Sequence, residues 1–252
     1  MYRMSNRRLG IALVAAALAL APAAIAGSAP EGTPTASPPP QPGSNLSAGK
    51  PSQPGDQQVA LLNVAYQLVE FGRKTKDPLA LVEAAKIMKL VGGQPVARKP
   101  ADAPAGAPAG APAPAAGKPA SAPPTPGSVL AEARSLAKGD KTILAMIAQA
   151  ASASSRGAVG GPKASVTSVI AGHTDVYNTA FVGGLPAEVV IAGDGGSDLD
   201  LAVVDENGNL ICSSSSPGDV EYCGWTPRWT GKFQIRVKNN GTVDNAYKLL
   251  TN

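Results

Sequence analysis

The chain has 252 residues, a formal net charge of +4 and an isoelectric point near 9.1, values that suggest a nucleic-acid-binding protein. The distribution of the charge excludes this class. Residues 27–163 carry 14 basic and 8 acidic side chains, whereas residues 164–252 carry 5 basic and 10 acidic ones, so the C-terminal part has no cluster of Lys and Arg that would bind phosphate.

Residues 1–26 are predicted to be a secretory signal peptide. They contain three arginines and no acid, an apolar run over residues 9–21, and a small-residue cleavage site that ends at Ala26. The run is short and rich in alanine for a membrane span, although a retained signal anchor is an alternative. We therefore expect a periplasmic or secreted protein that begins at Gly27, has no membrane span after cleavage and binds no nucleic acid.

Three segments are predicted to lack a packed core. Residues 27–56 are dominated by Pro, Ser, Gly and Ala. Because this composition buries too little apolar surface to offset the entropy of ordering, we expect a disordered tether. Residues 94–127 contain ten prolines and are expected to form an extended linker of polyproline II character. A last linker of small residues is expected over residues 154–163.

Residues 57–93 are predicted to form a hairpin of two helices, because apolar residues recur there at helical spacing. Gly72 is expected to end the first helix. Asp77 and Pro78 are expected to begin the second, since aspartate accepts hydrogen bonds at the N-cap and proline suits the first turn.

Residues 128–153 are predicted to form a second hairpin, in which Ser128 caps the first helix and Asp140 caps the next. Neither hairpin buries much apolar surface by itself. We therefore expect the two hairpins to pack together as a small four-helix unit, with the proline-rich segment looped out. Two loose hairpins on a flexible stalk are the alternative.

Residues 164–252 are predicted to form an all-β sandwich that folds by itself. The pattern changes here to short runs rich in Val, Ile and Tyr, separated by turn residues, which is typical of a sandwich. The eight expected strands cover residues 166–170, 176–182, 187–192, 199–204, 209–213, 221–225, 232–238 and 246–251. The fold class is therefore α + β multidomain, with short helical hairpins and linkers before an all-β domain.

The C-terminal part resembles the bacterial pre-peptidase C-terminal domain family. The resemblance rests on four stretches in this order: GDGGSDLDL at 193–201, DENGN at 205–209, WTP at 225–227 and TGKFQIRV at 230–237. It implies a jelly-roll-like sandwich that is appended to secreted bacterial proteins and is not itself catalytic. Ala202 departs from the family, which usually has an aromatic residue there, and no peptidase domain is recognisable before the module.

Asp194, Asp198 and Asp200 are candidate calcium ligands. Asp198 and Asp200 point the same way from one expected strand, Asp194 lies in the adjoining turn, and calcium prefers several oxygen ligands. Their spacing fits no EF-hand loop. The alternative is that Asp194 forms an Asx turn while the other two stand on a solvated face. No other cofactor is indicated.

Trp229, Arg236 and Lys238 are candidate binding residues. Two tryptophans flank a proline, and they indicate either a platform for sugar or peptide or an aromatic core, with Trp225 expected in the core. Arg236 and Lys238 are expected on an exposed sheet face. The only histidine, His173, is expected in a solvated loop, since no Gly-x-Ser-x-Gly elbow accompanies it, and no catalytic residue is predicted.

Cys212 and Cys223 are expected to form a disulfide, because they lie on two consecutive strands and export favours oxidation. Together these features predict an exported, non-catalytic binding or assembly protein of the bacterial envelope, whose partner is an envelope polymer or a protein. The alternative is an accessory module for a secreted peptidase or other hydrolase.

Overall fold

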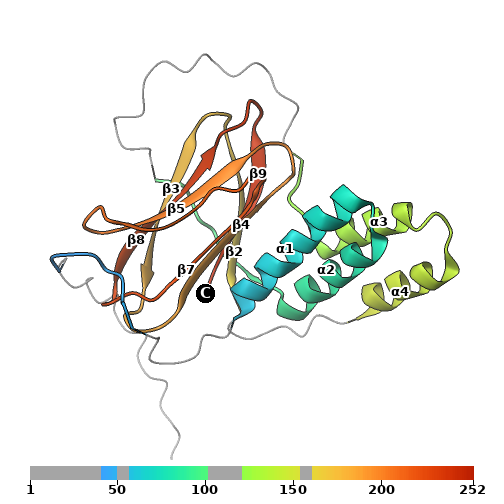
Figure 1. The fold of residues 1–252 in the computed structure, drawn as a ribbon, viewed down its shortest axis with the longest axis horizontal. Coiled ribbons are helices and arrows are strands. Elements are labelled where there is room, and N and C mark those ends of the chain that lie inside the picture. Colours follow the sequence, from blue (N-terminus) through green and yellow to red (C-terminus); the bar gives the residue numbers. More distant parts are fainter. Residues whose placement is uncertain (1–40, 50–56, 102–120, 154–160) are drawn as a thin grey trace, which may run out of the picture. The chain divides into compact units, whose positions relative to one another are not determined.

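The computed structural model describes residues 41–49, 57–101, 121–153 and 161–252. The predicted signal peptide and parts of the predicted tether and linkers lie outside these ranges. The described residues form four helices and two β-sheets (Figure 1). None of these four helices combines the length and apolar character that crossing a membrane requires.

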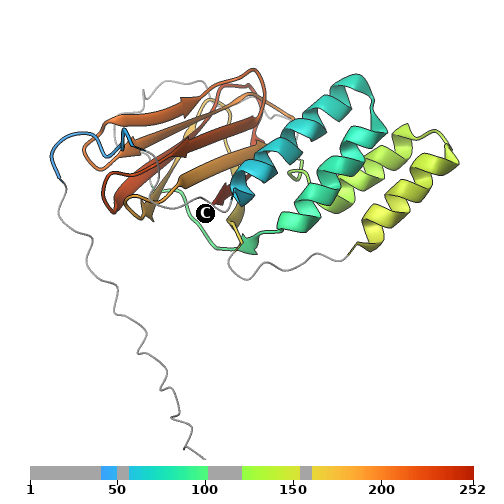
Figure 2. The same ribbon diagram turned by 60° about the horizontal axis from the view of Figure 1, so that its bottom comes forward.

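The helices pack on one another in chain order (Figure 2). Their bounds are Gln58–Thr75 for α1, Pro78–Val91 for α2, Pro126–Leu136 for α3 and Lys141–Ser152 for α4. Side chains from all four helices, such as Leu62, Leu81, Val129 and Ile147, belong to one buried apolar cluster. The two hairpins therefore pack together and are not two loose arms.

Gly72 does not end α1, contrary to the prediction. The glycine is buried inside the helix, which continues to Thr75 and is followed by Lys76 in a left-handed conformation (φ 58°). A Cβ atom at Gly72 would lie 2.8 Å from Cγ and Cδ2 of Leu81 in α2. The glycine is needed because α1 and α2 approach closely at this point, which the spacing of apolar residues within α1 cannot reveal.

Aspartates cap the second helix of each hairpin, as predicted. Oδ1 of Asp77 accepts the N–H groups two and three residues on at 2.8 and 3.3 Å, and Oδ1 of Asp140 does the same at 2.8 and 3.1 Å. The predicted cap of α3 was wrong, because Thr125 and not Ser128 is the N-cap. The two hydroxyl residues form a reciprocal capping box, so either residue fits the sequence pattern of a cap.

The nine strands form two sheets, sheet A in the order β1-β2-β9-β4-β7 and sheet B in the order β3-β8-β5-β6. Neighbouring strands are antiparallel except β1 and β2. The eight predicted strands are present, with ends that differ by at most three residues. The strands are β1 (Gln94–Pro95), β2 (Lys163–Val169), β3 (Thr174–Phe181), β4 (Ala187–Gly193), β5 (Leu199–Asp205), β6 (Leu210–Ser214), β7 (Val220–Trp225), β8 (Gly231–Asn239) and β9 (Asn245–Thr251).

The inner faces of the two sheets enclose one apolar core, to which alternate residues contribute in strands such as β4, β5 and β8. Three aromatic rings form its most compact part, with centroids 4.8 Å apart for Phe181 and Trp225 and 5.3 Å apart for Trp225 and Phe233. Trp225 is only 7% exposed, so its predicted place in the core is confirmed.

Part of the outer face of sheet A is also apolar, and the helices cover that part. Val190, Ala192, Val220 and Leu250 belong to the same buried cluster as the helix side chains, and α1 contacts β4 and β7. The helical part and the sandwich therefore share one apolar core. The sequence predicted two separate units and gave no indication of this shared core. Residues 164–252 on their own would expose these four side chains to water.

Residues 41–49 pack on the sandwich, so the predicted tether is wrong for this stretch. Asn45 is completely buried. Its backbone N–H donates to Oδ2 of Asp205 at 2.8 Å, and its Oδ1 accepts the N–H of Trp229 at 3.0 Å. Composition does not predict this contact. Apolar residues usually hold such a segment in place, whereas here a single asparagine does so through buried hydrogen bonds.

The first residues of the predicted proline-rich linker are also paired with the sandwich. Gln94 and Pro95 form the short parallel pairing with β2, and Ala101 forms a bridge with Val176 of β3. Between them, Nη2 of Arg98 donates to Oγ1 of Thr251 at 2.7 Å. The chain thus passes from the edge strand of sheet A to the edge strand of sheet B.

Candidate binding surface

The outer face of sheet B carries an open depression of about 390 Å³. The apolar cluster of the helices takes its sheet residues from sheet A alone, so this cluster does not cover sheet B. Hydroxyl groups of Thr174 and of residues 213–215 line the depression, together with Ala202. The small Ala202 side chain, half-buried on β5, leaves open the floor that a larger residue would fill.

Three charged side chains complete the lining of the depression: Asp200, Arg236 and Lys238. The pairing of β5 with β8 places Lys238 opposite Asp200 and Arg236 opposite Ala202. Nη2 of Arg236 donates to Oε1 of Gln234 at 2.9 Å. Within the described part of the chain, no ion pair joins Asp200 to either cation, so all three charges are available to a bound molecule.

The structure does not bring the three predicted calcium ligands together. Oδ1 of Asp194 accepts the N–H of Gly196 at 2.8 Å in an Asx turn, whereas Oδ1 of Asp198 accepts the N–H of Gly218 at 3.1 Å. Asp200 lines the depression instead. Over the described ranges, no group of three or more His, Cys, Asp or Glu side chains is placed to hold a metal ion. The geometry thus favours turn bonds over a calcium site.

Asp205 organises the turn between β5 and β6. Its Oδ1 accepts the backbone N–H groups of Asn207 at 2.9 Å and Asn209 at 2.8 Å, while Oδ2 accepts the N–H of Asn45. Burial alone raises the pKa of this carboxyl, but the hydrogen bonds outweigh burial and hold the pKa below its ordinary value. Asp205 is therefore a charged structural group that fixes both the turn and residues 41–49.

Asp219 precedes β7. It has the burial and the hydrogen bonds of a candidate functional acid, but the sequence pattern does not single it out. Its carboxylate accepts the N–H of Gly195 and, at 3.3 Å, Nδ2 of Asn245. Burial raises the pKa of Asp219, and the nearby Asp194 acts in the same direction, while these two hydrogen bonds oppose the rise. In the sequence it follows Pro217 and Gly218 and looks like an ordinary turn aspartate, so only the structure reveals its partners.

Trp229 does not line the depression that contains Arg236 and Lys238. Its indole Nε1–H donates to Oε1 of Glu206 at 2.5 Å, and its backbone N–H donates to Asn45. The half-buried ring therefore helps to hold residues 41–49 on the sandwich. A platform for sugar or peptide at this tryptophan stays a prediction.

His173 lies exposed in the connection between β2 and β3, as predicted. Its Nδ1 is 2.9 Å from the carbonyl oxygen of Ala171. Among the described residues, no hydroxyl is hydrogen-bonded to the ring. The geometry of a nucleophile with a histidine base is therefore missing from this part of the chain.

Cys212 and Cys223 form a disulfide. Cys212 belongs to β6 and Cys223 to β7, which are the edge strands of sheet B and sheet A. The bond therefore joins the two sheets at one side of the sandwich. Because Ser213 follows Cys212 directly, the disulfide also anchors the strand that supplies the serine hydroxyls of the depression.

No protein-family model and no curated protein matches this chain. Solved structures match its C-terminal part at low identity. The pre-peptidase C-terminal domain of collagenase from Bacillus anthracis shows 19% identity and a TM-score of 0.31, over 36% of this chain and 89% of that one.

Two further solved structures share this region. A periplasmic inhibitor of g-type lysozyme from Aeromonas hydrophila shows 13% identity and a TM-score of 0.28, over 36% of this chain and 86% of that one. The carbohydrate-binding module CBM36, solved with calcium and xylotriose, shows 15% identity and a TM-score of 0.26, over 37% of this chain and 89% of that one. These likenesses are too low to show a family. The β-sandwich of the C-terminal part is instead established by its own two sheets and the apolar core between them.

Proposed function

We propose that this chain is an exported, non-catalytic binding protein of the bacterial envelope and that the depression on sheet B is its binding surface. The observation that carries the proposal is the group of charged and hydroxyl side chains in a depression on the face that the apolar cluster of the helices does not cover. The partner is an envelope polymer or protein that presents carboxylate groups to Arg236 and Lys238.

The chemistry of the lining supports a ligand with both acidic and hydroxyl or amide groups. The guanidinium of Arg236 can bind a carboxylate through two parallel hydrogen bonds, while Lys238 adds a mobile positive charge. Asp200 and the serine hydroxyls can accept hydrogen bonds from the ligand. A polymer that repeats the motif would bind several such depressions at once and would gain affinity by multivalency.

Two further observations support the export and the absence of catalysis in this proposal. A disulfide between edge strands suits an oxidising compartment outside the cytoplasm. The only histidine of the chain has a backbone carbonyl as its hydrogen-bond partner, whereas general-base catalysis of hydrolysis would require a nucleophile or water positioned beside it.

Capture from an envelope extract tests the binding surface. The full chain without its predicted signal peptide serves as bait, beside the double variant Arg236→Ala/Lys238→Ala and the control Lys232→Ala. Lys232 is exposed on the same strand and outside the depression, so it controls for the loss of one charge. We expect the double variant to lose captured material by at least about tenfold, since charge-assisted hydrogen bonds contribute about 1.5–3 kcal/mol each. Equal capture by all three proteins would refute the assigned surface.

The captured material is then identified as polysaccharide or protein by its sensitivity to glycosidase or protease. Protease and glycosidase assays on the same purified chain test the absence of catalysis. We expect no turnover. Turnover that disappears in His173→Ala would show that the protein is an enzyme.

A further inference from the structure

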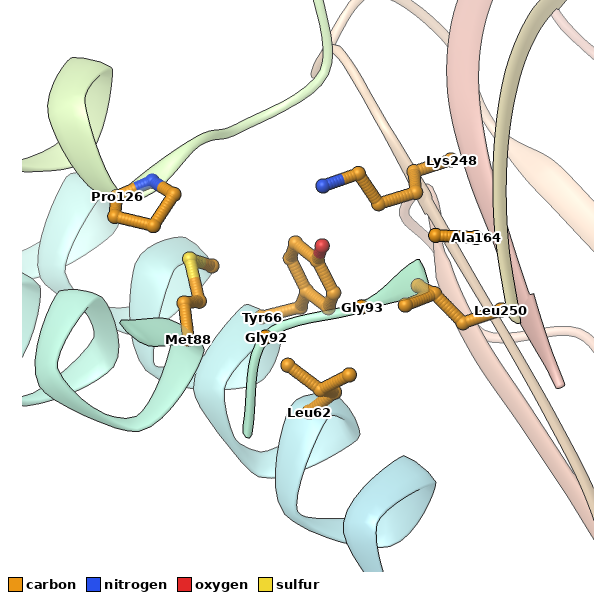
Figure 3. Close-up of a pocket in the computed structure, with 9 residues that line it drawn as sticks. All are labelled: Leu62, Tyr66, Met88, Gly92, Gly93, Pro126, Ala164, Lys248 and Leu250. Carbon is orange, nitrogen blue, oxygen red and sulfur yellow. The ribbon is translucent and has the colours of Figure 1, made fainter. Parts of the chain in front are cut away.

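A second cavity, of about 200 Å³, lies between the helices and sheet A (Figure 3). Apolar side chains form most of its wall: Leu62 from α1, Met88 from α2, Pro126 from α3 and Leu250 from β9. Two polar groups face into the same space, the hydroxyl of Tyr66 and the ammonium group of Lys248 (Figure 3). The cavity is separate from the depression on sheet B, with which it shares no residue.

Lys248 is the unexpected member of this lining. It lies on β9 between Val166 of β2, which is exposed, and Ala192 of β4, which is buried under the helices. Burial lowers the pKa of its ammonium group. Lys248 is half-buried. Among the described residues, its Nζ has neither an ion-pair partner nor a hydrogen bond to an acceptor, and even partial burial of an unpaired cation costs free energy.

Tyr66 supplies a second donor that stays neutral. It is 1% exposed, and burial raises the pKa of its phenol far above neutral pH, so the hydroxyl keeps its proton. Figure 3 shows this hydroxyl and Nζ of Lys248 directed into the same space. The cavity thus combines one positive charge and one neutral donor with apolar walls, and no carboxylate lines it.

We propose that this cavity binds a small aliphatic carboxylate, with its carboxylate between Lys248 and Tyr66 and its chain against Leu62, Met88 and Leu250. A monoanion balances the single positive charge, whereas a phosphate dianion would need further donors. The cavity volume equals that of about six or seven water molecules, which corresponds to a carboxylate of about four or five carbon atoms.

Titration of the full chain without its predicted signal peptide tests this proposal, with sodium pentanoate as the probe. The backbone amide signals of Gly92 and Gly93, which line the cavity, report binding in NMR spectra. We expect saturable shifts of both signals at millimolar pentanoate. 1-Pentanol, which has the same chain and no charge, should produce much smaller shifts, and equal shifts with both compounds would refute a carboxylate site.

Three variants assign the binding to the two polar groups. Lys248→Met keeps the length of the side chain without its charge and should weaken pentanoate binding at least about tenfold, because a charge-assisted hydrogen bond is lost. Tyr66→Phe should weaken it several-fold. Lys232→Met, a lysine outside both cavities, should leave it unchanged.

Unchanged binding in folded Lys248→Met would overturn the proposal. Thermal unfolding checks that this variant folds, and if it does not, unchanged binding in Tyr66→Phe overturns the proposal instead. The outcome is independent of the proposed envelope binding, since Arg236→Ala/Lys238→Ala leaves this cavity intact and pentanoate binding to that variant separates the two sites.

Discussion

Sheet A and sheet B contribute equally apolar inner faces to the sandwich, but their outer faces differ. Sheet A presents residues such as Val190, Ala192 and Leu250 to the helices. Sheet B presents Arg236 and Lys238, with hydroxyl groups beside them, in an open depression. The difference shows that one sheet of this sandwich serves as a packing surface while the other keeps its polar groups available to a partner.

The same contrast is visible within single strands. All seven residues of β4 are buried, whereas buried residues alternate with exposed or half-buried ones along β8. Strands covered on both faces have consecutive apolar residues, and strands with one wet face alternate. The pattern of apolar residues along a strand therefore indicates whether another layer covers its outer face.

Removal of an apolar contact from the covered face should give the largest effect. Leu250 is 1% exposed in the core shared by helices and sheet. Leu250→Ala should lower the free energy of unfolding by about 2–5 kcal/mol, because it removes buried methyl groups and leaves a cavity. Urea denaturation measures the change.

Lys238→Ala on the uncovered face is the control for this experiment, and it should change stability by no more than about 0.5 kcal/mol. Equal losses for the two variants would contradict the contrast between the two outer faces.

The disulfide should give the next largest effect, since it joins the edges of the two sheets. Cys212→Ala/Cys223→Ala should lower the free energy of unfolding by about 2–3 kcal/mol in the chain-entropy model. Alanine is preferred because Cys223 is buried, and serine would bury a hydroxyl. Two thiols that react with an alkylating reagent in the native protein would contradict the bond itself.

The sequence predicts the strands well because their signals are local. Alternation such as that of Phe233, Ile235 and Val237 requires only a few neighbouring residues, and turn residues mark the ends of each run. The caps at Asp77 and Asp140 are local in the same sense, since each aspartate bonds residues two and three positions further along.

Apart from the cap of α3, where Thr125 and Ser128 share one capping box, the errors involve contacts between segments distant in the chain. Gly72 is required by Leu81 of another helix, and Asn45 is fixed by Asp205 and Trp229. The helix layer on sheet A could have been inferred from β4, whose consecutive apolar residues indicate cover on both faces. Asp200 belongs with Arg236 and Lys238 rather than with the other aspartates, because β5 pairs with β8.

A matched pair of substitutions should sharpen the contrast between the faces at a smaller scale. Ala192 of β4 is buried under the helices, and Ala202 of β5 lies in the open depression. Ala192→Leu should lower the free energy of unfolding by about 1–3 kcal/mol through overpacking, whereas Ala202→Leu should leave it nearly unchanged because the added atoms enter open space. Thermal unfolding of both variants gives the comparison, and a larger loss for Ala202→Leu would contradict it.

The smallest effect is a pH dependence that belongs to the covered face. Burial holds the pKa of Lys248 in the folded protein below its ordinary value of 10.5. Between the lowered pKa and 10.5 the unfolded chain binds more protons, so the free energy of unfolding should rise with pH in that window. Below the window the folded protein bears the cost of the partly buried charge. Lys248→Met should therefore be more stable than the original chain at neutral pH, and the difference should shrink as pH approaches 10.5.

Urea denaturation over this range, with Lys238→Met as the control, measures that difference. Lys238 is exposed on sheet B, so its replacement controls for the exchange of one lysine for methionine outside the covered face. If the difference in free energy of unfolding between Lys248→Met and the original chain stays constant with pH, water reaches the Lys248 ammonium group in the folded protein. In that case the apolar cover of sheet A is incomplete at this position, and the two outer faces differ less than the packing of the helices indicates.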